Sequence, residues 1–157
     1  MFMKFALGVA LAASLILSAP SALADDQGCQ QYYTIRPQLA QASAMFHDER
    51  QGITDRELIG KLLDGGLPPR LVKDWADMLN QHAFIYTMAE GKGSDVNVIA
   101  AMFDQRNALN EMTVSLDSRG QTDLAAPAPP EVRAKLEKSF SHGATANTRL
   151  QQLCPAG

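Results

Sequence analysis

The sequence has 157 residues, with 14 basic and 17 acidic side chains. This length suits one ordinary domain that is large enough to bury a real hydrophobic core. The slight acidic excess argues against nucleic-acid binding, for which a basic surface would be expected.

Residues 1–24 carry the three parts of a secretory signal peptide. Lys4 supplies a positive charge, the apolar run FALGVALAASLIL follows, and Ala22 and Ala24 are the small residues that a signal peptidase reads. The apolar run is shorter than the roughly 20 residues of a membrane span. We therefore expect cleavage after Ala24. The product, residues 25–157, would be a periplasmic or secreted domain with 13 basic and 17 acidic residues and no stable membrane anchor.

The sequence contains two cysteines, Cys29 and Cys154. The acidic residues shortly before Cys29 do not suit a lipid attachment site. A metal site is disfavoured because neither cysteine has a second cysteine or a histidine at ligand spacing. In an oxidising compartment an even cysteine count favours a disulfide, against the alternatives of a free thiol pair or an intermolecular bridge. We expect this bridge to join the first helix to the last.

The first two helices are predicted over residues 28–50 and 55–64. Apolar residues recur at helical spacing in the first, although Pro37 is expected to kink or divide it. Thr54 and Glu57 have the spacing of a capping box at the start of the second helix, which should end at a pair of glycines.

The third helix is predicted to begin at Pro68 or Pro69, because proline is well tolerated in a first helical turn. Trp75 belongs to its expected core face. The segment HAFIYTMA, further along this helix, is apolar nearly all round, which is typical of a helix surrounded by others. We therefore expect the third helix to be the centre of the bundle.

The fourth helix is predicted over about residues 95–116, with Ser94 as its N-cap. The stripe expected to face the core has Arg106 as its polar exception and consists of Ile99, Met102, Phe103, Arg106, Leu109, Met112 and Leu116.

Residues 117–130 are predicted to form an exposed loop or linker, because they contain proline, alanine and glycine. The last helix should then begin at Pro130 or Glu131 and run through Phe140, with Gly143 as an interruption before the C-terminal end. Residues 131–157 would form a loose tail in one alternative, whereas the disulfide requires them to return to the first helix. The predicted fold is all-α, a small bundle of four to five helices with one disulfide joining the N- and C-terminal helices.

The three histidines, His47, His82 and His142, lie on different predicted elements and match no catalytic or metal-binding spacing. We interpret His82 as a hydrogen-bonded core residue and His47 as part of a solvated helix end. The mature methionines are interpreted mainly as core residues, although methionine also makes adaptable binding surfaces. We predict no catalytic residue, no metal and no cofactor.

The predicted function is binding to another protein, and the most specific version is an immunity-type inhibitor of an envelope-directed toxin. The alternatives are an envelope stress chaperone or adaptor, and a glycan-acting enzyme in which Trp75 and nearby acids line a cleft. A basic partner would be steered by acidic residues. We therefore expect the partner to bind at Asp48, Glu49 and Asp64. The sequence leaves the oligomeric state open.

Overall fold

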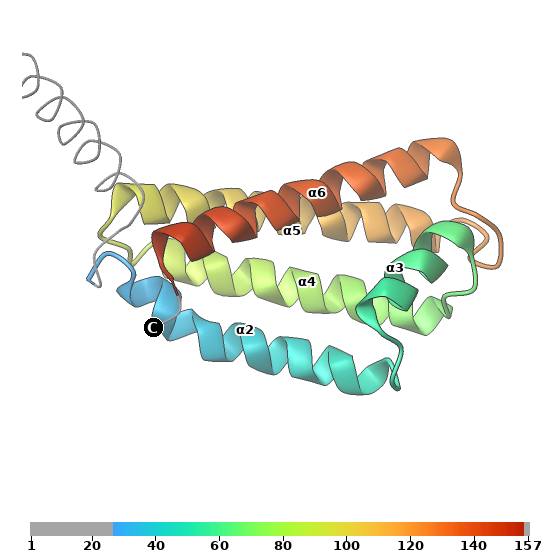
Figure 1. Cartoon of the computed structure of the whole chain (residues 1–157), viewed down its shortest axis with the longest axis horizontal. Coiled ribbons are helices and arrows are strands. Elements are labelled where there is room, and N and C mark those ends of the chain that lie inside the picture. Colours follow the sequence, from blue (N-terminus) through green and yellow to red (C-terminus); the bar gives the residue numbers. More distant parts are fainter. Residues whose placement is uncertain (1–26, 156–157) are drawn as a thin grey trace, which may run out of the picture.

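The computed structural model describes residues 27–155, and the chain is all-helical there. The predicted signal peptide and its cleavage site after Ala24 lie outside these residues. Five helices follow one another in the described part (Figure 1), with the bounds α2 (Gln30–Glu49), α3 (Asp55–Asp64), α4 (Pro69–Glu90), α5 (Val96–Gly120) and α6 (Pro130–Leu153).

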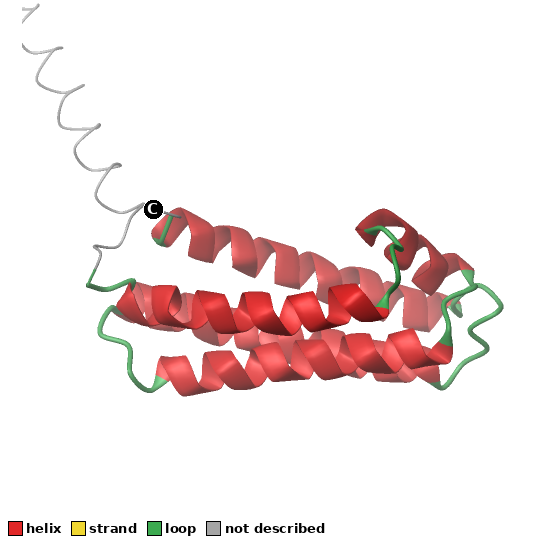
Figure 2. Ribbon diagram, turned by 90° about the horizontal axis from the view of Figure 1, so that it is seen from below, coloured by secondary structure: helices red, strands yellow, loops and turns green. Residues whose placement is uncertain are grey.

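The four long helices run up and down in turn. Helix α4 lies between α2 and α5, and α6 packs against α5. The short helix α3 lies at the end of the bundle where α2 finishes and α4 begins (Figures 1 and 2). Because the four long helices alternate in direction, the first and the last described residues lie together, at the end of the bundle opposite α3.

The helix starts follow local chemistry. The Thr54 hydroxyl accepts a hydrogen bond from the Glu57 amide, and the Glu57 carboxylate accepts one from the Thr54 amide, so the predicted capping box is present. Pro69 and Pro130 occupy the first positions of α4 and α6. The N-cap of α5 is Asp95 rather than the predicted Ser94, because the Asp95 carboxylate accepts from two amides of the first turn.

Two predicted breaks do not occur. Helix α2 is continuous through Pro37, which lies on the exposed side where water can bind the carbonyl left without a donor. Helix α6 continues through Gly143 to Leu153, so the loose-tail alternative is wrong. Gly143 is a place of close approach to α5, since a Cβ added there would lie 2.7 Å from the sulfur of Met112.

The predicted linker is shorter and more firmly held than expected. Helix α5 extends to Gly120, and two residues of the following loop, Leu124 and Ala128, are buried. The Gly66 amide donates to the Leu124 carbonyl at 2.8 Å, and the Ala128 amide donates to the Leu63 carbonyl at 2.8 Å. The loop therefore packs against the end of α3.

The predicted disulfide is confirmed. Cys29 and Cys154 are bonded with an S–S distance of 2.03 Å, and they are 125 positions apart in the sequence. The Tyr33 hydroxyl donates to the Pro155 carbonyl at 2.9 Å beside the bridge. The two ends of the described chain are thus fastened to each other.

Trp75 is buried at the centre of an aromatic cluster. Its ring stacks on Phe46 of α2 with centroids 6.0 Å apart and meets Phe140 of α6 edge-on at 5.2 Å. The core interpretation of Trp75 is therefore correct, and this side chain links three helices.

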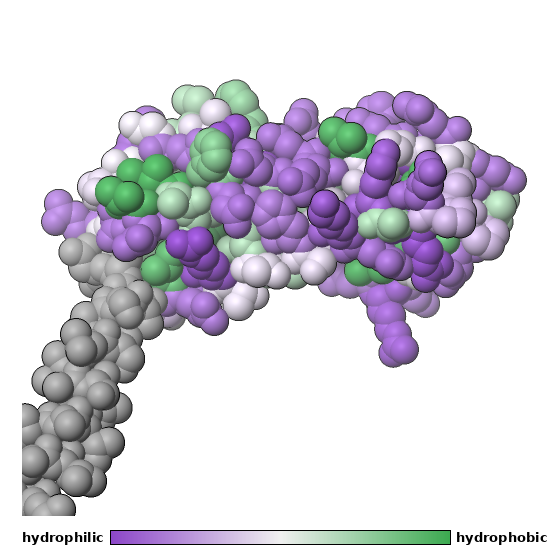
Figure 3. Space-filling view, turned by 90° about the horizontal axis from the view of Figure 1, so that it is seen from above, coloured by the Kyte–Doolittle hydropathy of each residue, from purple (hydrophilic) through white to green (hydrophobic). Residues whose placement is uncertain are grey.

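Several residues assigned to the core are exposed instead. Phe84 and Met88 of the HAFIYTMA segment are 65% and 54% exposed, and Phe103 of α5 is 49% exposed. Met45 of α2 is also exposed, whereas Met102 is fully buried. The outward-facing side of each of these helices is exposed to solvent, because no further helix packs against it. Figure 3 shows hydrophobic side chains gathered at one end of an otherwise mostly hydrophilic face.

Candidate functional site

Two depressions flank the C-terminal half of α2, and we call them together the α2 groove. Both are lined by Phe46 and Met78. The larger, of about 410 Å³, lies toward α3 and is lined by Ser43, Phe46, Arg50, Asp55, Leu58, Ile59, Trp75 and Met78. The smaller, of about 320 Å³, is lined by Ala42, Met45, Phe46, Glu49, Arg70, Asp74, Met78 and Gln81. They exist because α2 makes its main helix contact with α4 and is open on either side.

The rim of the larger depression carries an ion pair between Arg50 and Asp55. The Arg50 guanidinium lies 5.8 Å from the centre of the Phe46 ring and 2.8 Å from the ring nitrogen Nδ1 of His47. Its Nε atom is buried without a hydrogen-bond partner. The groove thus combines an aromatic floor with an arginine whose hydrogen-bonding capacity is not fully used.

The predicted partner-binding acids occupy different places. Asp48 is exposed in the last turn of α2. Glu49 lines the smaller depression and pairs with Arg70 of α4 at 3.1 Å. Asp64 lies at the far end of α3 and pairs with Arg133 of α6 at 3.1 Å. Of these three acids, Glu49 is the one that lines the α2 groove.

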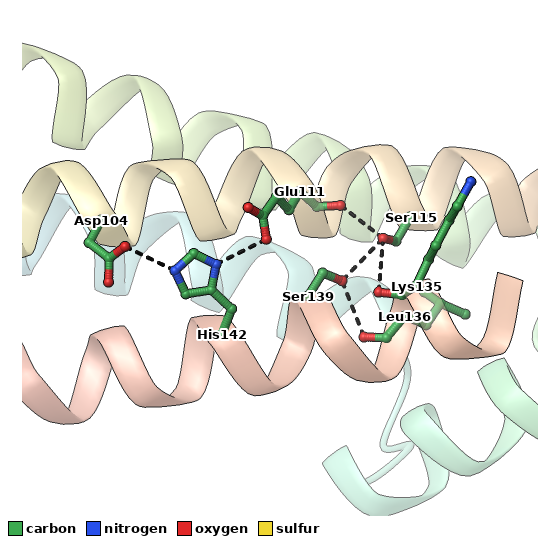
Figure 4. Close-up of polar contacts among 7 residues, drawn as sticks. All are labelled: Asp104, Glu111, Ser115, Lys135, Leu136, Ser139 and His142. Atoms are coloured by element: carbon green, nitrogen blue, oxygen red, sulfur yellow. Dashed lines mark hydrogen bonds and ion pairs between the residues drawn. The ribbon is translucent and has the colours of Figure 1, made fainter. Parts of the chain in front are cut away.

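A second polar group joins α5 to α6 (Figure 4). Nδ1 of His142 lies 2.9 Å from the Glu111 carboxylate, and Nε2 lies 2.9 Å from the Asp104 carboxylate. Both carboxylates only accept, so the ring must donate from both nitrogens, which requires its protonated form. These bonds raise the pKa of His142, with Glu111 the larger cause and Asp104 the second.

Two serines continue this contact between α5 and α6. The Ser139 hydroxyl lies 3.1 Å from the Ser115 hydroxyl, which in turn donates to the Glu111 carbonyl at 2.9 Å. The serines do not contact the imidazole of His142, and both of its nitrogens face carboxylates (Figure 4). A serine nucleophile needs a base within hydrogen-bond reach. This arrangement therefore fastens two helices and does not assemble a hydrolase site.

Arg119 is the most unusual buried residue, and nothing in the sequence marked it. Its side chain is fully buried and donates to the carbonyls of Leu62, Asp123 and Ala126 at 2.7, 3.0 and 2.7 Å. It also donates to the Thr122 hydroxyl at 2.8 Å. Arg119 thus holds the end of α3 against the loop that follows α5, and its role is structural.

The remaining predicted residues can also be placed. His82 is half-buried, and its Nε2 atom lies 3.1 Å from the Leu39 carbonyl oxygen, which agrees with the interpretation of a hydrogen-bonded interior residue. His47 is exposed at the end of α2. Asp74 and Asp77 are the acids on either side of Trp75. Asp74 lines the smaller depression together with Arg70, with which it pairs, whereas Asp77 is exposed and pairs with Lys73.

Within residues 27–155, none of the helices combines the length and the apolar composition of a membrane span. In the same residues, no three histidine, cysteine or acidic side chains are grouped so that they could hold a metal ion.

The chain was also compared with known proteins. No family model matches it, no curated protein matches it, and no solved structure matches it at a significant level. The function must therefore be inferred from the structure of the chain itself.

Proposed function

We propose that this protein is exported and acts by binding another polypeptide in the α2 groove. The observation that carries the proposal is the lining of the groove, in which the rings of Phe46 and Trp75 form an apolar floor beneath a charged rim. Aromatic and methionine side chains with arginine nearby are the residues enriched at the centres of protein interfaces.

The rim favours a partner segment that is apolar with basic residues beside it. Three acids line the groove, Glu49, Asp55 and Asp74, against two arginines, Arg50 and Arg70, and the exposed Asp48 precedes Glu49 in the last turn of α2. A basic segment would meet a surface of opposite charge, which speeds association.

An inhibitor of a basic envelope-directed toxin is the specific role that we favour, because it needs a preformed groove and an acidic rim but no catalytic group. The disulfide fits an exported chain. The second candidate is a chaperone or adaptor of the envelope, and the methionines of the groove favour it. Met45 is 61% exposed and Met78 is half-buried, and flexible thioethers adapt to several partners.

The test compares two exposed methionines. Met45→Asp places a charge in the groove, whereas Met88→Asp places the same charge on α4, outside the residues that line it. The tagged mature protein is used to capture partners from an envelope extract, and captured proteins are identified by mass spectrometry. We expect a basic protein that is captured by the wild type and by Met88→Asp and is lost with Met45→Asp. Equal capture by all three proteins would contradict the proposed site.

The purified partner then allows the charge argument to be tested. Asp48→Lys and Glu49→Lys should each slow association and flatten its dependence on salt, because they weaken electrostatic steering. Asp64→Lys is the comparison, since Asp64 lies on α3 against α6. Association rates are measured over a range of ionic strength. If Asp64→Lys has the largest effect of the three, the partner binds at the end of α3 and not in the groove.

A further inference from the structure

A histidine contacts the rim of the α2 groove from the last turn of α2. Nδ1 of His47 lies 2.8 Å from a guanidinium nitrogen of Arg50, the residue that directly follows the helix. The same guanidinium pairs with Asp55 in the first turn of α3. Arg50 and Asp55 both line the larger depression. His47 is therefore bonded to a residue of the groove although it is not one of the lining residues itself.

The contact with Arg50 fixes the protonation state of the His47 ring. A guanidinium carries only N–H groups and can only donate, so Nδ1 of His47 must accept with its lone pair. A protonated imidazole has hydrogen on both nitrogens and no lone pair to offer. The contact therefore exists only with a neutral ring. His142 is the opposite case, because both of its nitrogens face carboxylates.

Charged groups from three helices lie around this contact. They are Asp48 and Glu49 of α2, Arg50 after it, Asp55 of α3, and Arg70 of α4, which pairs with Glu49. Among the described residues, the His47 ring has its polar side-chain contact with Arg50 and forms no ion pair with these acids. A protonated ring would thus place a second positive charge directly beside the guanidinium.

Protonation of His47 has two consequences for the groove, and both act in the same direction. It removes a hydrogen bond that holds Arg50 beside the Phe46 ring, whose centre lies 5.8 Å from the guanidinium. It also adds a positive charge beside a lining in which three acids face two arginines, so the excess of negative charge is cancelled. A basic segment is attracted less strongly by a surface that has lost its opposite charge.

We propose that protonation of His47 weakens the binding of basic polypeptide segments in the α2 groove. Histidines in proteins change charge between about pH 5 and about pH 8. The groove therefore binds at neutral pH and releases its partner in mildly acidic surroundings. This inference rests on the function proposed above and adds its regulation by pH.

The test uses the mature, disulfide-bonded protein and, as a basic probe, a synthetic amphipathic peptide of leucine and lysine. The dissociation constant is measured at about pH 7.5 and about pH 5.5, a range in which histidines change charge while carboxylates stay ionised. We expect the affinity of the wild type to fall several-fold at the lower pH. Lysines of the probe keep their charge at both pH values, so the change belongs to the protein.

Two substitutions of His47 isolate the effect of its charge. His47→Gln cannot be protonated and can still accept from Arg50, so its affinity should be the same at both pH values. His47→Lys carries a permanent charge and should bind as weakly at both pH values as the wild type does at the lower one. His142→Gln, on α6 and outside the residues that line the groove, is the matched control and should keep the pH dependence of the wild type.

An NMR titration without peptide gives a second readout, in which the signals of the His47 ring and of the Arg50 Nε–H group should shift together. Equal affinity of the wild type at both pH values would overturn the proposal, as would a pH dependence that persists in His47→Gln. Met45→Asp identifies the other kind of failure. A peptide that does not bind the wild type, or that binds Met45→Asp as tightly, contradicts the proposed function itself and with it this regulation.

Discussion

At the scale of single residues, Arg119 shows how one buried side chain can define a junction. Three carbonyls from two separate segments accept hydrogen bonds from its guanidinium, and no carboxylate among the described residues forms an ion pair with it. Burial lowers the pKa of Arg119, but a guanidinium remains charged at any physiological pH. The carbonyl dipoles therefore take the place of a counter-ion at the end of α3.

Arg119→Met should destabilise the protein by about 3 kcal/mol or more, because it leaves several buried carbonyls without donors. Arg119→Lys should not restore the loss, since an ammonium cannot reach carbonyls on two segments in the way the planar guanidinium does. The free energy of unfolding is measured by chemical denaturation. Arg149→Met, at an exposed position of α6, is the control and should change it by less than about 0.5 kcal/mol.

His142 and His82 should give the stability of the protein opposite responses to pH. Hydrogen bonds to Glu111 and Asp104 raise the pKa of His142 above its ordinary value of 6.5. The stability that His142 contributes is therefore complete below pH 6.5 and is lost as pH rises through the higher folded pKa. Burial lowers the pKa of His82, so its contribution is present above pH 6.5 and is lost as pH falls toward the lower folded pKa.

The stabilities of His142→Gln, His82→Gln and the wild type are compared from about pH 5 to about pH 9, the range in which histidines titrate. His142→Gln should be less stable than the wild type at the acidic end, and the difference should shrink as pH rises. His82→Gln should show the opposite trend, with its larger loss at the alkaline end. Thermal unfolding midpoints across the range provide the measurement. Parallel curves for the wild type and His142→Gln would mean that the imidazolium does not stabilise the contact between α5 and α6.

At the scale of helices, α4 is the element on which the others are arranged. It contacts α5 along one side and α2 along another, and Trp75 extends the contact to Phe140 of α6. Helix α2 has α4 as its main helix neighbour, so its position depends on Trp75 and Phe46 at one end and on the disulfide at the other. The groove on either side of α2 is a direct consequence of this sparse packing.

Trp75→Ala should cost about 3–5 kcal/mol, the range for truncating a large buried aromatic residue. Phe84→Ala removes an aromatic ring from the same helix but at a 65% exposed position, and it should cost less than about 0.5 kcal/mol. Denaturant titrations of both variants test the pair. A loss at Phe84 as large as the loss at Trp75 would show that the outer side of α4 is covered in solution.

At the scale of the whole molecule, the disulfide closes the described chain into a loop. The even number of long helices brings Cys29 and Cys154 to the same end, where the bridge ties α2 to α6. A cross-link over 125 positions greatly restricts the unfolded chain. This matters most for α2, because the bridge supplements its contact with α4.

Replacing both cysteines by alanine should lower the free energy of unfolding by about 5 kcal/mol, the value that chain entropy assigns to a loop of this length. Denaturation of the double variant and of the wild type, with and without reductant, is the measurement. Reductant should lower the stability of the wild type and leave the double variant unchanged. Hydrogen exchange should show the largest loss of protection in α2.

The sequence by itself determined the features that depend on near neighbours or on simple counts. Helical spacing, the capping box at Thr54 and the prolines at the starts of α4 and α6 act within one or two turns, so the helices could be predicted. The pairing of Cys29 with Cys154 followed because two cysteines allow one intramolecular bridge. The buried position of Trp75 followed from its helical spacing to other apolar residues.

Only the tertiary structure decided which side of each helix is covered. Phe84, Met88 and Phe103 are as apolar as core residues, and they are exposed because no helix lies over them. The bonds of His142 to Asp104 and Glu111, and those of Arg119 to three carbonyls, join residues whose approach depends on how α3, α5 and α6 pack. The α2 groove is likewise a space between elements. No local pattern encodes such features, because they arise from distances between segments that are far apart along the chain.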